Sequence, residues 1–148
     1  MCLNPRAGSL FIMGIRRNAR ELALQALYQM EVTGDRSPRA LDLFLSHFEG
    51  GGEAKDFARQ LISGVMTNRE RIDAIIAKSA ENWKLQRMAK VDLLILRIAT
   101  YELLFCPDIP MNVSLDEAIE IGKRYGSADS PTFINGVLDQ VAAAAGAK

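Results

Sequence analysis

The chain has 148 residues, of which 18 are basic and 18 acidic, so its formal net charge is zero. Apolar residues make up 49% of it, which is enough for a hydrophobic core and argues against extended disorder. No apolar run approaches the roughly 18 residues that a membrane-spanning helix requires. The composition therefore indicates one globular domain without a membrane segment.

The two cysteines, Cys2 and Cys106, lie far apart and make no disulfide framework of the kind found in small secreted domains. The apolar patch at residues 10–13 is too brief for a secretory signal. We therefore expect a reduced, cytoplasmic protein. We also predict that residues 1–13 are a flexible extension ahead of a domain at 14–148, with translation starting at either Met1 or Met13.

Apolar residues recur with a helical period along the rest of the chain, and no segment alternates with the period of two that is typical of a strand. Glycine and proline separate the periodic segments. We predict helices over residues 15–33, 38–48, 54–66, 69–80, 88–105, 115–125 and 132–144. The sequence thus predicts a compact all-α domain of about seven helices.

Several helix starts carry capping residues. Ser37 precedes a proline at the first helical position, Asn68 suits the cap of the fourth helix, and Ser130 suits that of the last. The run 114–117 has the serine and glutamate spacing of a capping box. We therefore expect the sixth helix to begin just after Ser114.

The predicted helix at 88–105 is apolar almost all round, so we expect the other helices to surround it. Arg97 lies inside it, and a buried arginine needs a partner that the sequence does not identify. Gly136 interrupts the last helix at a cost of about 1 kcal/mol relative to alanine. Such a glycine indicates that another helix or a ligand approaches closely.

The residues offer little for catalysis. His47 is the single histidine, so the chain has no second histidine around which a Ser–His or Cys–His arrangement could be built. We interpret His47 itself as structural. No cysteine or histidine cluster has zinc spacing, and the glycines at 50–52 lack the residues of a nucleotide-binding loop. We predict a protein that is not an enzyme and needs no metal or cofactor.

Positive charge is concentrated at the N-terminal end. The first 20 residues hold four arginines and no acid, whereas the remaining 128 hold 14 basic and 18 acidic residues. On a helical wheel Arg17 and Tyr28 lie within about 20° of each other, with Arg20 to one side. Guanidinium groups bind phosphates and an aromatic ring stacks on an unpaired base, so this stripe suits RNA. A solvated helix end with Tyr28 at the edge of the core explains the pattern equally well.

The start of the last helix, residues 129–133, is a second candidate. Backbone N–H groups at a helix N-terminus hold anions, and Phe133 would stack on a base if it is exposed. The pattern alone favours the alternative, in which the helix is merely capped and Phe133 belongs to the core.

Four stretches together resemble one family, in the same order and over most of residues 14–144. They are residues 16–28, 91–104, 114–123 and 129–139. The family is NusB, a group of bacterial transcription antitermination factors. The resemblance implies an all-α fold of two packed helical halves and the binding of boxA-type single-stranded RNA in leader and ribosomal RNA transcripts.

The resemblance also implies partners and site residues. The family acts with NusE, a ribosomal protein, in an RNA polymerase antitermination complex that reads past terminators. Asp92 falls where the family places an acidic residue that faces NusE. By similarity, the RNA-binding residues are Arg16, Arg17, Arg20, Tyr28, Asp129, Phe133 and Asn135.

Two departures from the family pattern lower the positive charge. Asn18 stands where some members have a third consecutive arginine, and Thr132 stands where many have lysine. If three arginines each neutralise one phosphate, the slope of log affinity against log salt is about −2. We therefore expect weak RNA affinity without the partner. Whether the chain forms a homodimer stays open.

Two other functions remain possible from the sequence. One is a helical interaction module without RNA, whose arginines bind an acidic protein. The other is a stand-alone relative of the N-terminal domain of ribosomal RNA cytosine methyltransferases. Those enzymes need a separate cofactor-binding domain, for which we expect no room in 148 residues.

Overall fold

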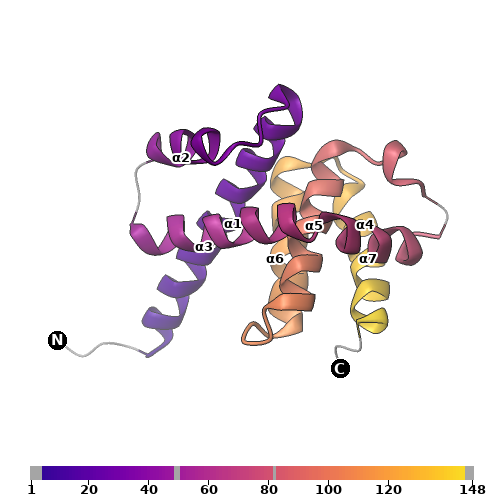
Figure 1. Cartoon of the computed structure of the whole chain (residues 1–148). Helices are drawn as coiled ribbons and strands as arrows, with labels where there is room; N and C mark the ends of the chain where they lie inside the picture. The colour runs from indigo at the N-terminus through magenta and orange to yellow at the C-terminus, as the bar shows by residue number, and fades with distance from the viewer. Residues whose placement is uncertain (1–4, 49–50, 82, 146–148) are drawn as a thin grey trace. The chain divides into compact units, whose positions relative to one another are not determined.

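The structure, a computed structural model, describes residues 5–48, 51–81 and 83–145, and side chains from residue 14 onward. Along these residues every regular element is helical and no strand occurs, which confirms the all-α class (Figure 1). The elements are α1 (Pro5–Thr33), α2 (Pro38–Ser46), α3 (Gly52–Thr67), α4 (Arg69–Ser79), the short 3₁₀ helix η1 (Leu85–Arg87), α5 (Lys90–Phe105), α6 (Met111–Tyr125) and α7 (Ser130–Ala144).

The chain divides into two compact units, residues 1–60 and 61–148, and the division falls inside α3. The two units match the two helical halves that the family resemblance implies. We describe each unit by itself.

In the first unit, α1 buries one face at the apolar positions that the periodicity predicted. Those residues are Ala19, Leu22, Ala23, Ala26, Leu27 and Met30. The predicted start at Ile15 is wrong, because the helix already begins at Pro5. Each residue added to an existing helix gains one backbone hydrogen bond, which favours continuation of the helix beyond the apolar stripe. The flexibility of residues 1–13 stays a prediction, and residues 1–4 lie outside the described part.

The link between α1 and α2 is a tight polar turn. Gly34 ends α1 with a positive φ of 75°, and its N–H donates to the Met30 carbonyl at 2.8 Å. The Ser37 hydroxyl accepts a hydrogen bond from the Ala40 N–H at 3.1 Å, which confirms the predicted cap of α2. The backbone N–H and hydroxyl of Ser37 also donate to Asp35, which holds the pKa of that carboxyl below its usual value.

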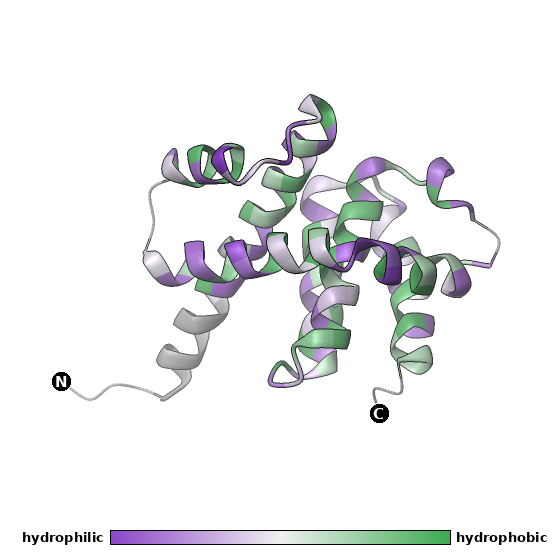
Figure 2. Cartoon of the chain, viewed as in Figure 1, coloured by the Kyte–Doolittle hydropathy of each residue, from purple (hydrophilic) through white to green (hydrophobic). Residues whose placement is uncertain are grey.

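In the second unit, α5 is the central helix, as predicted. It contacts α4, α6 and α7, and α7 in turn contacts α4 and α6. Figure 2 shows that hydrophobic residues dominate along α5 and α7. Leu94, Ile95 and Leu96 are buried in succession, so no side of this part of α5 faces water.

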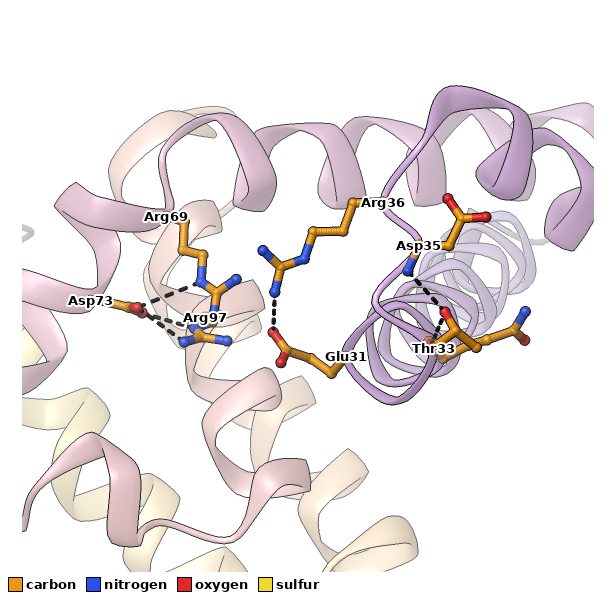
Figure 3. A network of polar contacts seen from close by, with 8 residues as sticks. Glu31, Thr33, Asp35, Arg36, Arg69, Asp73 and Arg97 are labelled. Carbon is orange, nitrogen blue, oxygen red and sulfur yellow. Dashed lines mark hydrogen bonds and ion pairs between the residues drawn. The ribbon is translucent and has the colours of Figure 1, made fainter.

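The buried Arg97 has a partner that the sequence did not identify. Its guanidinium donates to both carboxylate oxygens of Asp73 in α4, through Nε at 2.8 Å and an Nη atom at 3.0 Å. The Nε of Arg69 lies 3.8 Å from the same carboxylate, and Figure 3 shows both arginines pointing toward it. This forked ion pair joins α5 to α4.

The predicted capping box is wrong. α6 begins at Met111, directly after Pro110, so Ser114 lies inside the helix rather than at its start. Its hydroxyl donates instead to Glu102 of α5 at 3.0 Å, and both residues are buried. Proline ends the preceding segment and allows the new helix to start at once, so the earlier start prevails over the local signature.

Two other predicted caps differ in the same way. Asn68 does precede α4, but its amide donates back to the Gly64 carbonyl at 2.9 Å and caps nothing. α7 begins at Ser130 itself, with Asp129 at the cap position and no hydrogen bond from its side chain to the helix. The Asn68 side chain thus bonds back to the preceding helix, which is a local alternative to capping the next one.

We predict that Asp73→Ala destabilises the protein, because it removes the forked partner of an arginine whose side chain is only 7% exposed. The free energy of unfolding should fall by roughly 3 kcal/mol, the lower end for a broken buried pair, since part of Asp73 reaches solvent. Urea unfolding measures the change.

The matched control is Asp42→Ala, which removes the exposed pair with Arg59 at 2.6 Å and should cost less than about 1 kcal/mol. Equal losses in the two variants would mean that the Arg97 pair contributes no more than a surface contact.

Candidate nucleic-acid interface

The three arginines of α1 that the sequence analysis grouped together differ in their exposure to solvent. Arg17 is exposed, Arg16 is half-buried, and Arg20 is buried, with 2% of its surface exposed. Phosphates are reached from solvent, so the first two arginines are the ones that an RNA strand can approach. Arg20 lies in the core rather than beside it, and its role in RNA binding stays a prediction.

One aromatic ring contacts two of these arginines. Phe57 of α3 lies below both the Arg16 and the Arg20 guanidinium groups, at 5.0 and 5.5 Å from the ring centroid. Stacking uses the flat face of a guanidinium, whereas phosphate is bound by its N–H edge. Sequence reasoning missed Phe57, because its contact with α1 is tertiary and no local pattern reports it.

Tyr28 is exposed, with 43% of its surface reaching solvent. This geometry favours the stacking interpretation over the alternative of a tyrosine at the edge of the core. Arg17 and Tyr28 are separated by about 16 Å along the helix axis, so they would contact different nucleotides. We call Arg16, Arg17 and Tyr28 the α1 surface.

The start of α7 is held by a buried hydrogen bond to α5. The hydroxyl of Ser130, which is 1% exposed, donates to Asp92 Oδ1 at 2.7 Å and accepts from the Ser127 N–H at 2.9 Å. This bond leaves the neighbouring Asp129 and Asn135 exposed on the outside of the helix.

Asp92 is 8% exposed, and its observed contact is with Ser130 inside the molecule. It therefore has a structural role that the sequence did not reveal, since the two residues are far apart along the chain. Its expected position facing NusE stays a prediction.

Phe133 is half-buried and pairs with Trp83, which lies between α4 and η1 and which the sequence analysis did not single out. The two ring centroids are 5.6 Å apart, and the planes meet at 76°. Trp83 is 55% exposed. A large aromatic residue next to a turn was the available signal, but nothing local shows that it faces solvent.

The two rings border a recess of about 430 Å³, which we call the aromatic recess. This volume lies within the range of small-ligand sites. Its other lining residues include Ser79, Glu81, Thr132, Gly136 and Gln140.

The remaining chemistry of the described residues is sparse. They contain no group of three or more histidine, cysteine, aspartate or glutamate side chains arranged to hold a metal ion. No helix among them is long and apolar enough to cross a membrane. His47 is exposed, and its Nδ1 lies 2.8 Å from the Leu43 carbonyl, a local contact with its own helix.

Comparison with known proteins places the chain among the NusB proteins. The model of the NusB family matches residues 17–143. The transcription antitermination protein NusB of Desulfatibacillum aliphaticivorans is 50% identical over 87% of this chain and 90% of its own length. The protein of the same name from Geobacter sulfurreducens is also 50% identical, over 88% of this chain and 95% of its own.

Solved structures agree. T. maritima NusB is 42% identical and superposes with a TM-score of 0.79 over 86% of this chain and 90% of its own. A crystal structure of the antitermination factors NusB and NusE in complex with dsRNA gives a TM-score of 0.79 at 24% identity, over 89% of this chain and 98% of its own, and supports the fold. With a family match over most of its length and relatives of half-identical sequence, this chain belongs to the NusB family.

Proposed function

We propose that this protein is a transcription antitermination factor that binds boxA-type single-stranded RNA together with the ribosomal protein NusE. It acts through binding, in the cytoplasm, as part of an RNA polymerase antitermination complex. The observation that carries the proposal is the α1 surface, where exposed Arg17 and Tyr28 offer a phosphate ligand and a stacking ring on one helix. Membership of the NusB family supports the same function.

The aromatic residues favour a single strand. A ring stacks on a base only where the base is unpaired. Exposed rings are Tyr28 on α1 and Trp83, which contacts Phe133 at the start of α7. The fold neighbour with NusE was solved with dsRNA, so a matched duplex belongs in every binding test.

The charge balance favours binding with a partner. Nucleic-acid affinity comes largely from phosphate contacts, and the chain is neutral with two arginines accessible on the α1 surface. A basic partner docked beside the RNA would supply the missing contacts. We propose NusE for this role, with Asp92 at the start of α5 as part of its docking surface.

The alternative function is an interaction module whose arginines bind an acidic protein. It needs the same cations but no stacking ring, so Tyr28 separates the two proposals. Tyr28→Ala should weaken RNA binding and leave an acidic-protein contact unchanged.

The first prediction concerns Arg17→Ala. We expect RNA affinity to fall about tenfold, because a charged hydrogen bond to phosphate is lost, while the unfolding midpoint stays constant. The slope of log affinity against log salt should be about −1.4 for two arginines on a single strand and about −0.7 in the variant. Fluorescence anisotropy of labelled RNA measures both quantities.

The matched control is Arg39→Ala, an exposed arginine of α2 outside the α1 surface. It should leave the affinity unchanged. Leu94→Ala, which truncates a core residue, should instead cost roughly 2–5 kcal/mol of stability. Unaltered RNA affinity in Arg17→Ala would show that the RNA face lies elsewhere.

A second prediction concerns the partner. With NusE present, boxA RNA should bind more tightly than a scrambled strand of the same composition and more tightly than a duplex. Anisotropy titrations with and without NusE measure the difference. Equal affinity for the three RNAs in the presence of NusE would contradict the proposed function.

A third prediction tests Asp92. If its carboxylate contacts NusE, Asp92→Asn, which removes the charge but keeps an acceptor for the Ser130 hydroxyl, should weaken NusE binding. Ser130→Ala, which removes the internal hydrogen bond and keeps the charge, should not. Calorimetric titration with NusE compares the two variants. Equal weakening in both would mean that Asp92 acts only by holding the start of α7.

A further inference from the structure

Gly136 is a glycine that the fold itself does not require. It lies inside α7, where glycine weakens a helix relative to alanine. A Cβ atom at Gly64 would overlap the Tyr101 ring, and one at Gly122 would lie 2.8 Å from Ile134 Cδ1, so packing explains both of those glycines. A Cβ at Gly136 meets nothing within 4 Å. The predicted close approach of another helix is therefore wrong. Of the two explanations that the sequence offered for Gly136, the close approach of a ligand is the one left.

Gly136 lies in the aromatic recess, together with the rings of Trp83 and Phe133. Trp83 and Phe133 meet at 76°, so a flat molecule stacked on one ring meets the other edge to face. Stacked and edge-to-face contacts are the arrangements that aromatic quadrupoles favour. The missing side chain of Gly136 leaves part of the lining open for close approach of such a ring.

Besides the two rings and Gly136, the lining has four polar residues, Ser79, Glu81, Thr132 and Gln140, and two apolar ones, Ala80 and Val137. The polar residues carry hydroxyl, carboxylate and amide groups. A nucleobase carries donors and acceptors on its edge and satisfies such groups, whereas an apolar side chain of a protein partner leaves them unsatisfied.

We infer that the aromatic recess binds one unpaired base of the RNA, stacked on Trp83. The inference rests on the proposed function and adds a residue, Trp83, and an open helix position, Gly136, to the RNA contacts. A second recess, lined by residues of α1 and α2 and of the turn between them, has a volume of about 220 Å³ and falls below the usual range of ligand sites.

Trp83 reports on its own surroundings, because it is the single tryptophan of the chain. The experiment adds unlabelled boxA RNA to the full-length protein with NusE and records Trp83 emission after subtraction of the NusE signal. Stacking on a base should quench the emission, and the quenching should saturate at the same RNA concentration as the anisotropy of labelled RNA.

Variants test the two parts of the recess separately. Trp83→Ala should weaken RNA binding about five- to tenfold, the lower part of the range for a lost base–aromatic stack, and Trp83→Phe should restore most of it. Gly136→Leu should fill the recess and weaken binding by a similar factor. Its unfolding midpoint should stay constant or rise, because leucine is a better helix former than glycine and a Cβ atom at this position meets nothing within 4 Å.

The matched control is Leu43→Ala, which removes an apolar side chain, 61% exposed, from α2 outside the recess. It should leave RNA affinity unchanged. Suppose that anisotropy shows RNA binding while Trp83 emission stays unchanged, and that Gly136→Leu binds RNA with normal affinity. This result would overturn the inference and leave the proposed function intact.

Two other outcomes also overturn it. If NusE alone changes Trp83 emission and RNA adds nothing, the recess is a protein contact. If no RNA raises the anisotropy with or without NusE, the proposed function fails and the inference fails with it.

Discussion

A helix that is apolar on every side must be covered on every side, and α5 imposes this constraint on the second unit. Hydrophobic burial is not directional, so it does not by itself fix where each neighbouring helix lies along α5. Three buried polar residues of α5 supply that information, each bound by a different helix. Ser130 of α7 binds Asp92, Asp73 of α4 binds Arg97, and Ser114 of α6 binds Glu102. Because a buried polar group without its partner is costly, these bonds exclude sliding of the neighbours.

The same bonds position the aromatic recess. One side of it comes from the end of α4 and the residues that follow, and the other from the start of α7. Both helices are fastened to α5, through Asp73 and Ser130, so the recess is bordered by elements with fixed positions. A site that is held before its ligand arrives loses less entropy on binding. Stability of this unit and the proposed RNA contact therefore depend on shared hydrogen bonds.

The sequence predicted helix existence and the central place of α5 because hydrophobic periodicity is a local signal. It failed where a local signature and a tertiary partner compete. Ser114 has the spacing of a capping residue whether or not the helix starts there, and only the contact with Glu102 decides. The partner of Arg97 was hidden for the same reason, because Asp73 lies on another helix. In the candidate site, Arg17 and Tyr28 could be found from a helical wheel, but the burial of Arg20 and the exposure of Trp83 depend on tertiary packing.

A neutral chain with two accessible arginines on its α1 surface is a poor general ligand for nucleic acid, since phosphate neutralisation dominates nonspecific affinity. Stacking rings add affinity only where bases are unpaired, and they depend little on salt. Within the proposed function, this balance is an advantage, because a factor surrounded by other transcripts gains selectivity when charge contributes little. The α1 surface thus supplies few phosphate contacts. A partner bound to the same RNA would supply the remaining ones, and it would do so only at the RNA site that both proteins recognise.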